Sequence, residues 1–264
     1  MSISRKPQTT PPKDAVQSLF FKTQPASLIL EILRKIPKDN PYSGFNTKTM
    51  PTEYFVGREF AIKVRAALQN KKKPVFTGPG LCNGLSLLWL YTTGIKNVEW
   101  FYAVKRSIMM DAHAAISSHH RDIFLNVVNV WQDPSLHIDG IKWPDMDKLF
   151  NCKMQTQSGA MDLAQLTLYL ANLQQEDLAR ISSDYDTNNH AIGVAYDGHT
   201  YSLFDTGYSN RNVKLFTAAK SLAQEIHRIL KIVTADTVPI IINITNGTQL
   251  RPQPSLYNPR RRRM

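Results

Sequence analysis

The stretch Gly78-Pro-Gly-Leu-Cys82-Asn-Gly-Leu-Ser-Leu-Leu-Trp-Leu-Tyr91 decides how this chain is interpreted. Two glycines and a proline predict a tight turn, because glycine tolerates backbone angles that other residues avoid while proline fixes its own. The nearly unbroken apolar run that follows indicates a helix buried on most sides. Cys82 lies where the turn meets this helix, and the positive end of the helix dipole favours a thiolate there. Cys82 is therefore a candidate nucleophile; the alternative is a small buried hydrophobic residue.

The composition is that of an ordinary soluble protein. The chain has 264 residues, of which 42% are hydrophobic and 20% charged, so it can bury a sizeable core. It contains no apolar run of about 18 residues, as a membrane-spanning helix would need. Cys82 and Cys152 make no disulfide framework and favour folding in a reducing compartment.

The chain is strongly basic, with a formal net charge of +11 and a pI near 9.6, which favours acidic partners. Part of this charge lies in the lysine run 71–73 and in the arginine run 260–263. The arginines most simply form a solvated tail, and the alternative is attraction to an anionic membrane surface or to nucleic acid. No basic motif is interleaved with aromatic residues, so specific nucleic-acid recognition is not expected.

The apolar spacing predicts a helix-rich first part and a β-rich last third. This pattern is typical of an α+β fold, and we expect one domain over 26–250 between a disordered leader, 1–25, without a signal peptide and a basic disordered tail, 251–264. The predicted helices are 27–36, 57–68, 83–91, two helices within 97–131 broken near 117–121, 160–175 and 213–233, and the predicted strands are a hairpin over 190–205 and a final strand over 239–245.

The hairpin brings two polar residues together. A two-residue turn at Asp197-Gly198 would place His190 directly opposite Asp205, and opposed residues share a face with Cβ atoms about 4.5–5.5 Å apart. This pairing depends on the length of the loop between the two strands. The same face carries large apolar side chains, which we expect to pack on the helix 83–91 and so bring His190 toward Cys82; they are Ile192, Val194, Tyr201 and Leu203.

Three residues in this arrangement would form a catalytic triad. Asp205 would accept a hydrogen bond from one ring nitrogen of His190, and the other nitrogen would take the proton of Cys82 and later return it to a leaving amine. Each residue also has a plainer interpretation. His190 could be a strand-end histidine satisfied by backbone, and Asp205 could be a turn residue before Thr206-Gly207.

The motifs that carry these residues are 80–89 (GLCNGLSLLW), 190–194 (HAIGV) and 203–205 (LFD). In this order they resemble the papain-like cysteine peptidases of the YopT type, which are bacterial effectors injected into host cells. The resemblance covers roughly 75–215. It implies a papain-like fold, a Cys82–His190–Asp205 triad, no cofactor and a host-cell protein as substrate. It also implies secretion without a cleavable signal and action in the host cytoplasm, where the basic tail would suit an anionic membrane surface.

Two departures from the family pattern leave alternatives open. Thr206-Gly207 follows the acid where such peptidases often continue with Pro-Asn, and Phe76 and Thr77 stand where an amide side chain would complete the oxyanion hole. The Cys82 N–H should supply one donor to this hole, and the second could come only from Gln69 or Asn70. A papain-like acyltransferase or deamidase would use the same triad, and a catalytically decayed binding module is the alternative from another class.

A metal site is not expected. A cluster of acidic and histidine residues lies around 111–120, but it lacks the spacing of a known zinc motif, and a partly exposed helix end explains it better. The members of this cluster are Asp111, His113, His119 and His120.

The oligomeric state is not determined by the sequence.

Overall fold

The computed structural model describes residues 57–78, 80–110, 117–133, 135–136, 155–183, 190–207, 213–230 and 238–250. The predicted leader, the predicted helix 27–36 and the basic tail lie outside these ranges, so the predictions made for them stay predictions. Among the described residues, none of the helices combines the length and apolar character required to cross a bilayer.

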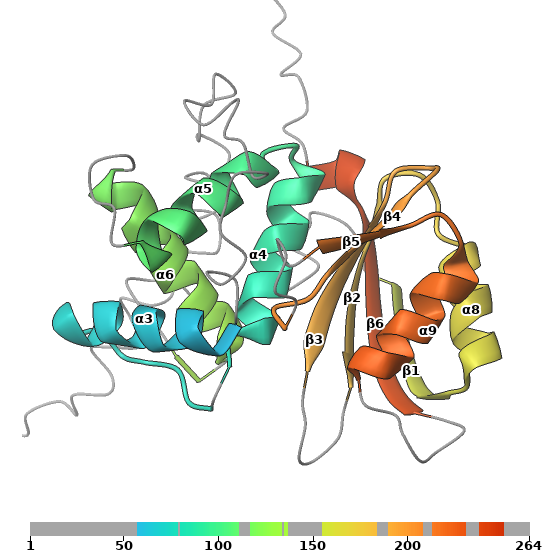
Figure 1. The fold of residues 1–264 in the computed structure, drawn as a ribbon, viewed down its shortest axis with the longest axis horizontal. Helices are drawn as coiled ribbons and strands as arrows, with labels where there is room; N and C mark the ends of the chain where they lie inside the picture. Colours follow the sequence, from blue (N-terminus) through green and yellow to red (C-terminus); the bar gives the residue numbers. More distant parts are fainter. Residues whose placement is uncertain are drawn as a thin grey trace, which may run out of the picture.

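The protein has three layers, in which an antiparallel sheet lies between two groups of helices (Figure 1). The strands are β1 (Gln155–Met161), β2 (Asp177–Ser183), β3 (Ala191–Tyr196), β4 (Tyr201–Phe204), β5 (Val213–Phe216) and β6 (Val238–Asn246), in the order β1-β6-β2-β3-β4-β5. One face carries α3 (Gly57–Asn70), α4 (Cys82–Gly94), α5 (Val98–Met109) and α6 (Ser118–Gln132), and the other carries α8 (Leu163–Ala171) and α9 (Ala219–Ile229). A short 3-10 helix, Gly247–Leu250, follows β6.

The helices α3 to α6 agree with the predicted helices between residues 57 and 131, whereas the second half differs in three places. β1 occupies the residues just before α8, so that helix is shorter than the predicted 160–175, and β2 was not predicted at all. The predicted helix 213–233 begins only at Ala219, because Val213–Phe216 pairs with β4 as an edge strand. Leu215 on this strand is 68% exposed.

α4 is the central helix of the protein, and close approaches on two sides bury it. A Cβ atom at Gly84 would lie 2.1 Å from the Val128 carbonyl oxygen of α6, and one at Gly193 would lie 2.9 Å from Trp89. Both positions therefore need glycine for steric reasons. The helix is held between α6 and β3, and its aromatic side chain Trp89 stacks on Phe204 of β4 with ring centroids 5.2 Å apart.

The hairpin packs with the opposite face to the one predicted. Its small residues Ala191, Gly193 and Ala195 face α4, because larger side chains would not fit under so close a helix. The large residues Ile192 and Val194 belong instead to a second core on the other face of the sheet. That core also contains Tyr201, Leu203, Leu166 and Leu170 of α8, and Leu222 and Ile226 of α9.

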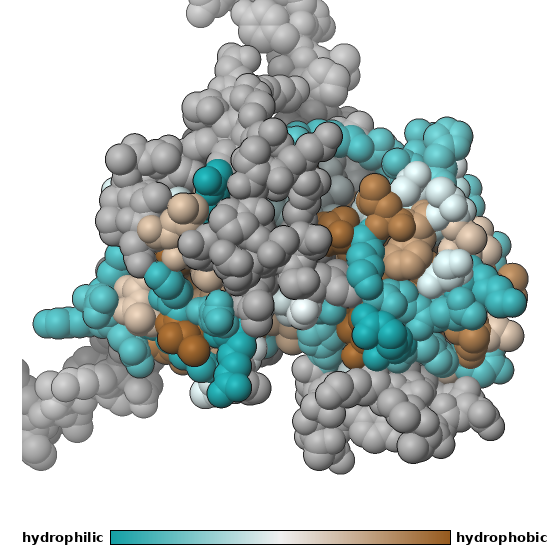
Figure 2. Space-filling view, viewed as in Figure 1, coloured by the Kyte–Doolittle hydropathy of each residue, from teal (hydrophilic) through white to brown (hydrophobic). Residues whose placement is uncertain are grey.

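Large apolar side chains that are exposed in the described part of the chain lie far apart in the sequence. They occur on α3, after α5, on α8 and on β5, and the view in Figure 2 shows separate hydrophobic patches within a mostly hydrophilic surface. Isolated apolar residues of this kind are usual on soluble proteins.

Candidate active site

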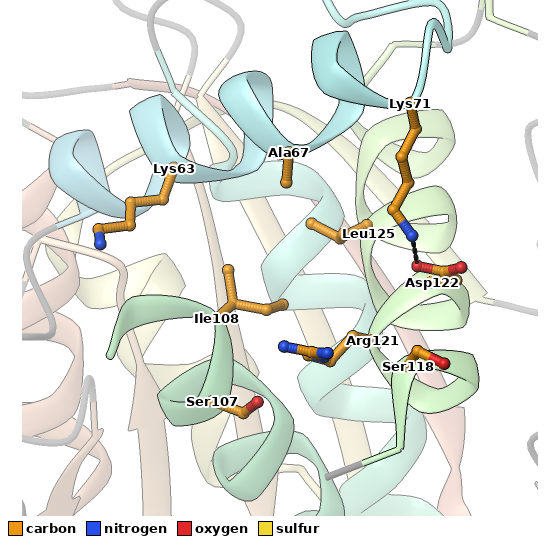
Figure 3. Close-up of a pocket in the computed structure, with 9 residues that line it drawn as sticks. All are labelled: Lys63, Ala67, Lys71, Ser107, Ile108, Ser118, Arg121, Asp122 and Leu125. Carbon is orange, nitrogen blue, oxygen red and sulfur yellow. Dashed lines mark hydrogen bonds and ion pairs between the residues drawn. The ribbon is translucent and has the colours of Figure 1, made fainter. Parts of the chain in front are cut away.

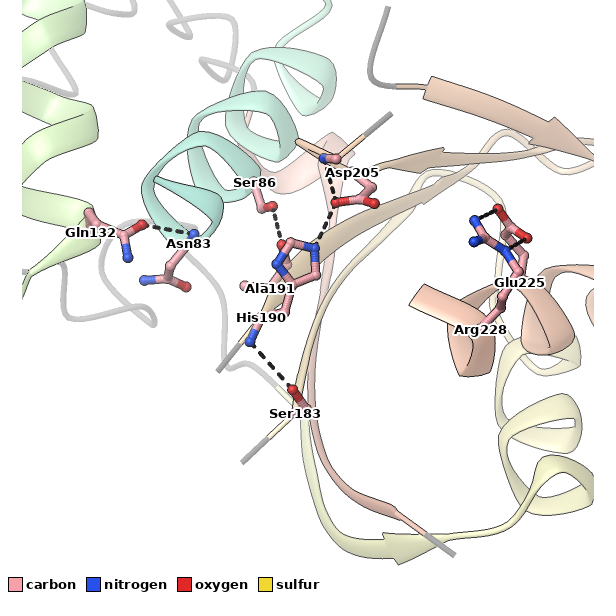
Figure 4. A network of polar contacts seen from close by, with 10 residues as sticks. Asn83, Ser86, Gln132, Ser183, His190, Ala191, Asp205, Glu225 and Arg228 are labelled. Carbon is pink, nitrogen blue, oxygen red and sulfur yellow. Dashed lines mark hydrogen bonds and ion pairs between the residues drawn. The ribbon is translucent and has the colours of Figure 1, made fainter. Parts of the chain in front are cut away.

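The last turn of α6 holds the turn around Cys82 from both sides. Asn129 Oδ1 accepts a hydrogen bond from the Phe76 N–H at 2.8 Å, ahead of the turn. Gln132 Oε1 accepts from the Asn83 N–H at 3.0 Å and from the Gly84 N–H at 3.1 Å, after the turn (Figure 4). These bonds satisfy N–H groups that the first turn of a helix leaves without partners, and they fix where α4 begins.

Asp133, the residue directly after α6, adds a charged group beside these contacts. Its Oδ2 accepts from the Thr77 N–H at 3.1 Å and from the Thr77 hydroxyl at 2.9 Å, and its Oδ1 accepts from the Ser135 hydroxyl at 2.6 Å. The hydrogen bond from Ser135, followed by those from Thr77, lowers the pKa of Asp133 to about 2. Asp133 is therefore ionised throughout the physiological range and anchors the chain just before the Gly78 turn.

The hairpin register differs from the prediction by two residues. Val194 pairs with Leu203 and Tyr196 with Tyr201, so the connection is four residues long. The carboxylate of Asp197 accepts hydrogen bonds from the N–H groups of His199 and Thr200 at 2.8 and 2.7 Å, which stabilises this longer loop instead of a two-residue turn. A shift of two residues leaves unchanged which side chains of the hairpin share a face.

His190 and Asp205 are therefore diagonal neighbours rather than directly opposed residues, and they still meet. His190 Nε2 lies 2.7 Å from Asp205 Oδ1 (Figure 4). The same oxygen accepts from the Gly207 N–H at 3.0 Å, so Asp205 is at once a turn residue and the partner of the imidazole. The buried turn is fixed further by α3, whose Gly57 N–H donates to the Thr206 carbonyl at 3.0 Å.

A contact between α4 and β3 brings His190 to Cys82. Ser86 lies one turn after Cys82 on the same side of α4, and its hydroxyl donates to the Ala191 carbonyl at 3.0 Å. The Ala191 N–H and the His190 side chain both hydrogen-bond the Cys82 sulfur. Because Nε2 of His190 is occupied by Asp205, Nδ1 is the ring nitrogen left for Cys82. The structure thus brings together all three predicted site residues.

The electrostatics of this group favour an ion pair. Burial alone would raise the pKa of the Cys82 thiol, but the hydrogen bond and charge of His190 and the N–H groups of Ala191 and Asn83 outweigh it, so that the pKa is lowered. Burial would lower the pKa of His190, but Asp205 and Cys82 together raise it to about 10. Both shifts favour a thiolate beside an imidazolium, which is the reactive form of a cysteine nucleophile.

The two residues predicted as oxyanion donors do not reach this site. Gln69 and Asn70 are exposed at the end of α3, next to Lys71, which pairs with Asp122. Asp122 precedes Gln132 by ten residues of α6, or roughly 15 Å along the helix. Gln132 was not predicted as a site residue, since it lies one residue beyond the predicted helices within 97–131, and Ser86 was not predicted either.

A separate pocket of about 130 Å³ lies between α3, α5 and α6 (Figure 3). The Lys71–Asp122 ion pair and Arg121 line it together with the apolar side chains Ile108 and Leu125. Ser118, at its edge, is the first residue of α6, whereas Gln132 is the last. Leu125, the lining residue of α6 nearest to Gln132, precedes it by seven residues, so the pocket is separated from the candidate active site by roughly 10 Å of helix.

No group of three or more metal-ligating side chains occurs in the part of the chain that the structure describes. His119 and His120 lie in the first turn of α6, where the His120 ring packs at 6.2 Å from Trp100. Asp111 and His113 lie outside the described residues.

Comparison with known proteins finds similarity only among solved structures. No protein-family model and no curated protein matches the chain. The crystal structure of the Pseudomonas avirulence protein AvrPphB is similar over 62% of this chain and 91% of that chain, with 16% sequence identity and a TM-score of 0.30. The functional interpretation of the chain therefore depends on the geometry of its own site.

Proposed function

We propose that this chain is a cysteine peptidase that hydrolyses a peptide bond of a host-cell protein, with Cys82, His190 and Asp205 as its catalytic triad. One observation carries the proposal. A half-buried cysteine at the start of a helix is hydrogen-bonded to a histidine whose other ring nitrogen lies 2.7 Å from a buried carboxylate. The motifs around these residues, which resemble the YopT type, support a protein as the substrate.

The proposed reaction begins from the thiolate–imidazolium pair. The Cys82 sulfur attacks the scissile carbonyl carbon, and the carbonyl oxygen becomes an oxyanion. His190 then gives its proton to the leaving amine, the C–N bond breaks, and a thioester remains on Cys82. Neutral His190 next takes a proton from water, which hydrolyses the thioester and restores the ion pair. Asp205 holds the ring orientation throughout.

We propose that Gln132 completes the oxyanion hole together with the Cys82 N–H. Its Oε1 already accepts from two backbone N–H groups of α4, and only the amide oxygen can accept. The Nε2 amide group therefore points away from these N–H groups. A donor held in this way needs no reorganisation when charge develops on the substrate. Gln132→Glu keeps the oxygen acceptor but removes the donor, and it should lower kcat by about 100-fold.

The first test measures the thiol without a substrate. Purified full-length protein is treated with iodoacetamide at about pH 6, and peptide mass spectrometry follows Cys82, with Cys152 and free N-acetylcysteine as references. We expect Cys82 to react far faster than both references and His190→Ala to abolish the difference. Equal, slow labelling of both cysteines in the wild type would contradict the nucleophile assignment.

The second test identifies the chemistry. A host-cell lysate is incubated with wild-type protein or with Cys82→Ala, and protein termini are profiled by mass spectrometry. New termini that require Cys82 support a peptidase. Conversion of glutamine to glutamate, or a transferred acyl group, would instead identify a deamidase or an acyltransferase, and no difference between the two samples would contradict all three activities.

A further inference from the structure

Arg180 is a cation beside the candidate active site that the proposed reaction does not use. It lies on β2 in register with Gly193 of β3 and Asn243 of β6, on the sheet face that packs against α4. Its Nε donates to Asn83 Oδ1 at 2.6 Å, and its Nη1 donates to Asn243 Oδ1 at 3.2 Å. The guanidinium therefore reaches from the middle of the sheet to the residue that follows Cys82.

The two side chains that accept from the guanidinium are uncharged. Both of its hydrogen-bond acceptors are neutral amides, and among the residues that the structure describes no carboxylate pairs with it. Withdrawing such a cation from water costs free energy unless a negative charge lies close by. Burial lowers the pKa of Arg180, and the charge of Cys82 opposes this by raising it.

The charged groups around Cys82 then balance. His190 approaches from the start of β3 and Asp205 lies behind it, while Arg180 approaches from β2 beneath the first turn of α4. The carboxylate of Asp133, directly after α6, faces Thr77 and Ser135, and the α6 residue in contact with the start of α4 is the neutral Gln132. Two cations thus accompany the Cys82 sulfur and the Asp205 carboxylate.

We propose that Arg180 is a positioning residue that keeps the Cys82 sulfur ionised, by its charge and by holding the first turn of α4 through Asn83. The inference rests on the proposed function, because a reactive thiolate matters only if Cys82 is the nucleophile. Asn83 links the two effects. Its Oδ1 accepts from Arg180, and its Nδ2 donates to the Trp131 carbonyl at 2.7 Å, so that the sheet, α4 and α6 meet at one side chain.

The experiment separates charge from shape with two substitutions at one position. The rate of Cys82 alkylation by iodoacetamide is measured against pH for full-length wild type, Arg180→Gln and Arg180→Lys, with Asn243→Ala as the matched control. Glutamine keeps a hydrogen-bond donor but removes the charge, whereas lysine keeps the charge without the planar fork. Asn243→Ala removes one anchor of Arg180 and leaves its bond to Asn83.

We expect the acid limb of the Arg180→Gln profile to move to higher pH, with the rate below the midpoint falling roughly tenfold for each unit of pKa. Arg180→Lys and Asn243→Ala should stay within about threefold of wild type at every pH. Superimposed profiles of wild type and Arg180→Gln would overturn the inference, and so would equal losses in the glutamine and lysine variants. If Arg180→Gln does not fold, a loss of about tenfold or more in folded Arg180→Lys overturns it alone.

The result is independent of cleavage. If the wild-type profile shows a lowered Cys82 pKa and Arg180→Gln has the same profile, only the role of Arg180 is contradicted. An absence of new protein termini in the lysate, with the profile shifts as expected, contradicts only the peptidase.

Discussion

The two faces of β3 are built from adjacent residues and have different roles. Toward α8 and α9 the strand presents Ile192 and Val194, which are fully buried among large aliphatic side chains. Toward α4 it presents Ala191 and Gly193, and over them Trp89 and Leu90 approach within contact distance. The first face stabilises the fold by burying apolar area. The second contributes little area, but its small residues let α4 lie close enough for Cys82 to meet His190.

This contrast teaches that the residues with the smallest side chains control the site. The predicted packing assigned α4 to the large apolar face, because that face must be covered and a buried apolar helix is a natural partner for it. The structure shows that the nucleophile helix lies on the small face, where hydrogen bonds from Ser86 and to Cys82 use the backbone of Ala191. Only a face without bulky side chains exposes its backbone to such contacts.

Gly193→Val should disrupt the packing of β3 against α4 more than any other substitution considered. The new Cβ would lie 2.9 Å from the Trp89 ring, so α4 or β3 must move. We expect a loss of about 3 kcal/mol or more in the free energy of unfolding, and a Cys82 that alkylates like an ordinary thiol. Urea unfolding and alkylation at about pH 6 measure the two effects. A variant that keeps both wild-type values would show that the close approach is not required.

Removing the acid should abolish most of the proposed activity while leaving both faces of β3 in place. Asp205→Asn is expected to lower kcat/KM by roughly 100-fold or more on a substrate found in the lysate experiment. In the wild type the imidazolium persists until the pH passes the His190 pKa of about 10, so the cleavage rate should fall only there.

The direction of the expected pKa change in Asp205→Asn follows from the effect of Asp205 on His190. Asp205 helps to raise the His190 pKa, so Asp205→Asn should shift the titration of His190 to lower pH, together with the alkaline limb of the rate. NMR titration of the His190 ring measures the midpoint directly. An unchanged midpoint in the variant would contradict the role given to Asp205.

The opposite face is tested by Val194→Ala, one residue from Gly193. Val194 is fully buried against α8 and α9, and its truncation should destabilise the fold by about 2 kcal/mol. The alkylation rate of the folded fraction should remain that of wild type. A loss of Cys82 reactivity comparable to that of Gly193→Val would remove the proposed division between the two faces.

The smallest expected effect comes from Ser86→Ala. The variant loses the hydrogen bond to the Ala191 carbonyl, which should cost about 1 kcal/mol in the free energy of unfolding and slow Cys82 alkylation severalfold. Thr92→Ala is the matched control, since the Thr92 hydroxyl donates to carbonyls of its own helix. The control should lose stability without losing thiol reactivity. Equal rates in both variants would show that Ser86 has no part in placing His190.

Local patterns of the chain were sufficient for several features. The turn and apolar run around Cys82 predicted a buried helix with a cysteine at its start, and the Asp197-Gly198 signal predicted the hairpin that pairs His190 with Asp205. Both depend on residues close together in the sequence, whose spacing and backbone preferences determine helix, turn and face. The predicted register was wrong by two residues, yet His190 and Asp205 kept a common face because side chains alternate along a strand with a period of two.

Only the tertiary structure decided which face of the sheet received α4, where the edge strand Val213–Phe216 belonged, and which polar side chains joined Cys82. Gln132, Arg180 and Ser86 reach the site through contacts that span 48, 97 and 105 residues of sequence in Gly84–Gln132, Asn83–Arg180 and Ser86–Ala191. No local pattern marks such residues, because their role depends on how closely two elements pack. That distance was set by the absence of side chains at Gly84 and Gly193.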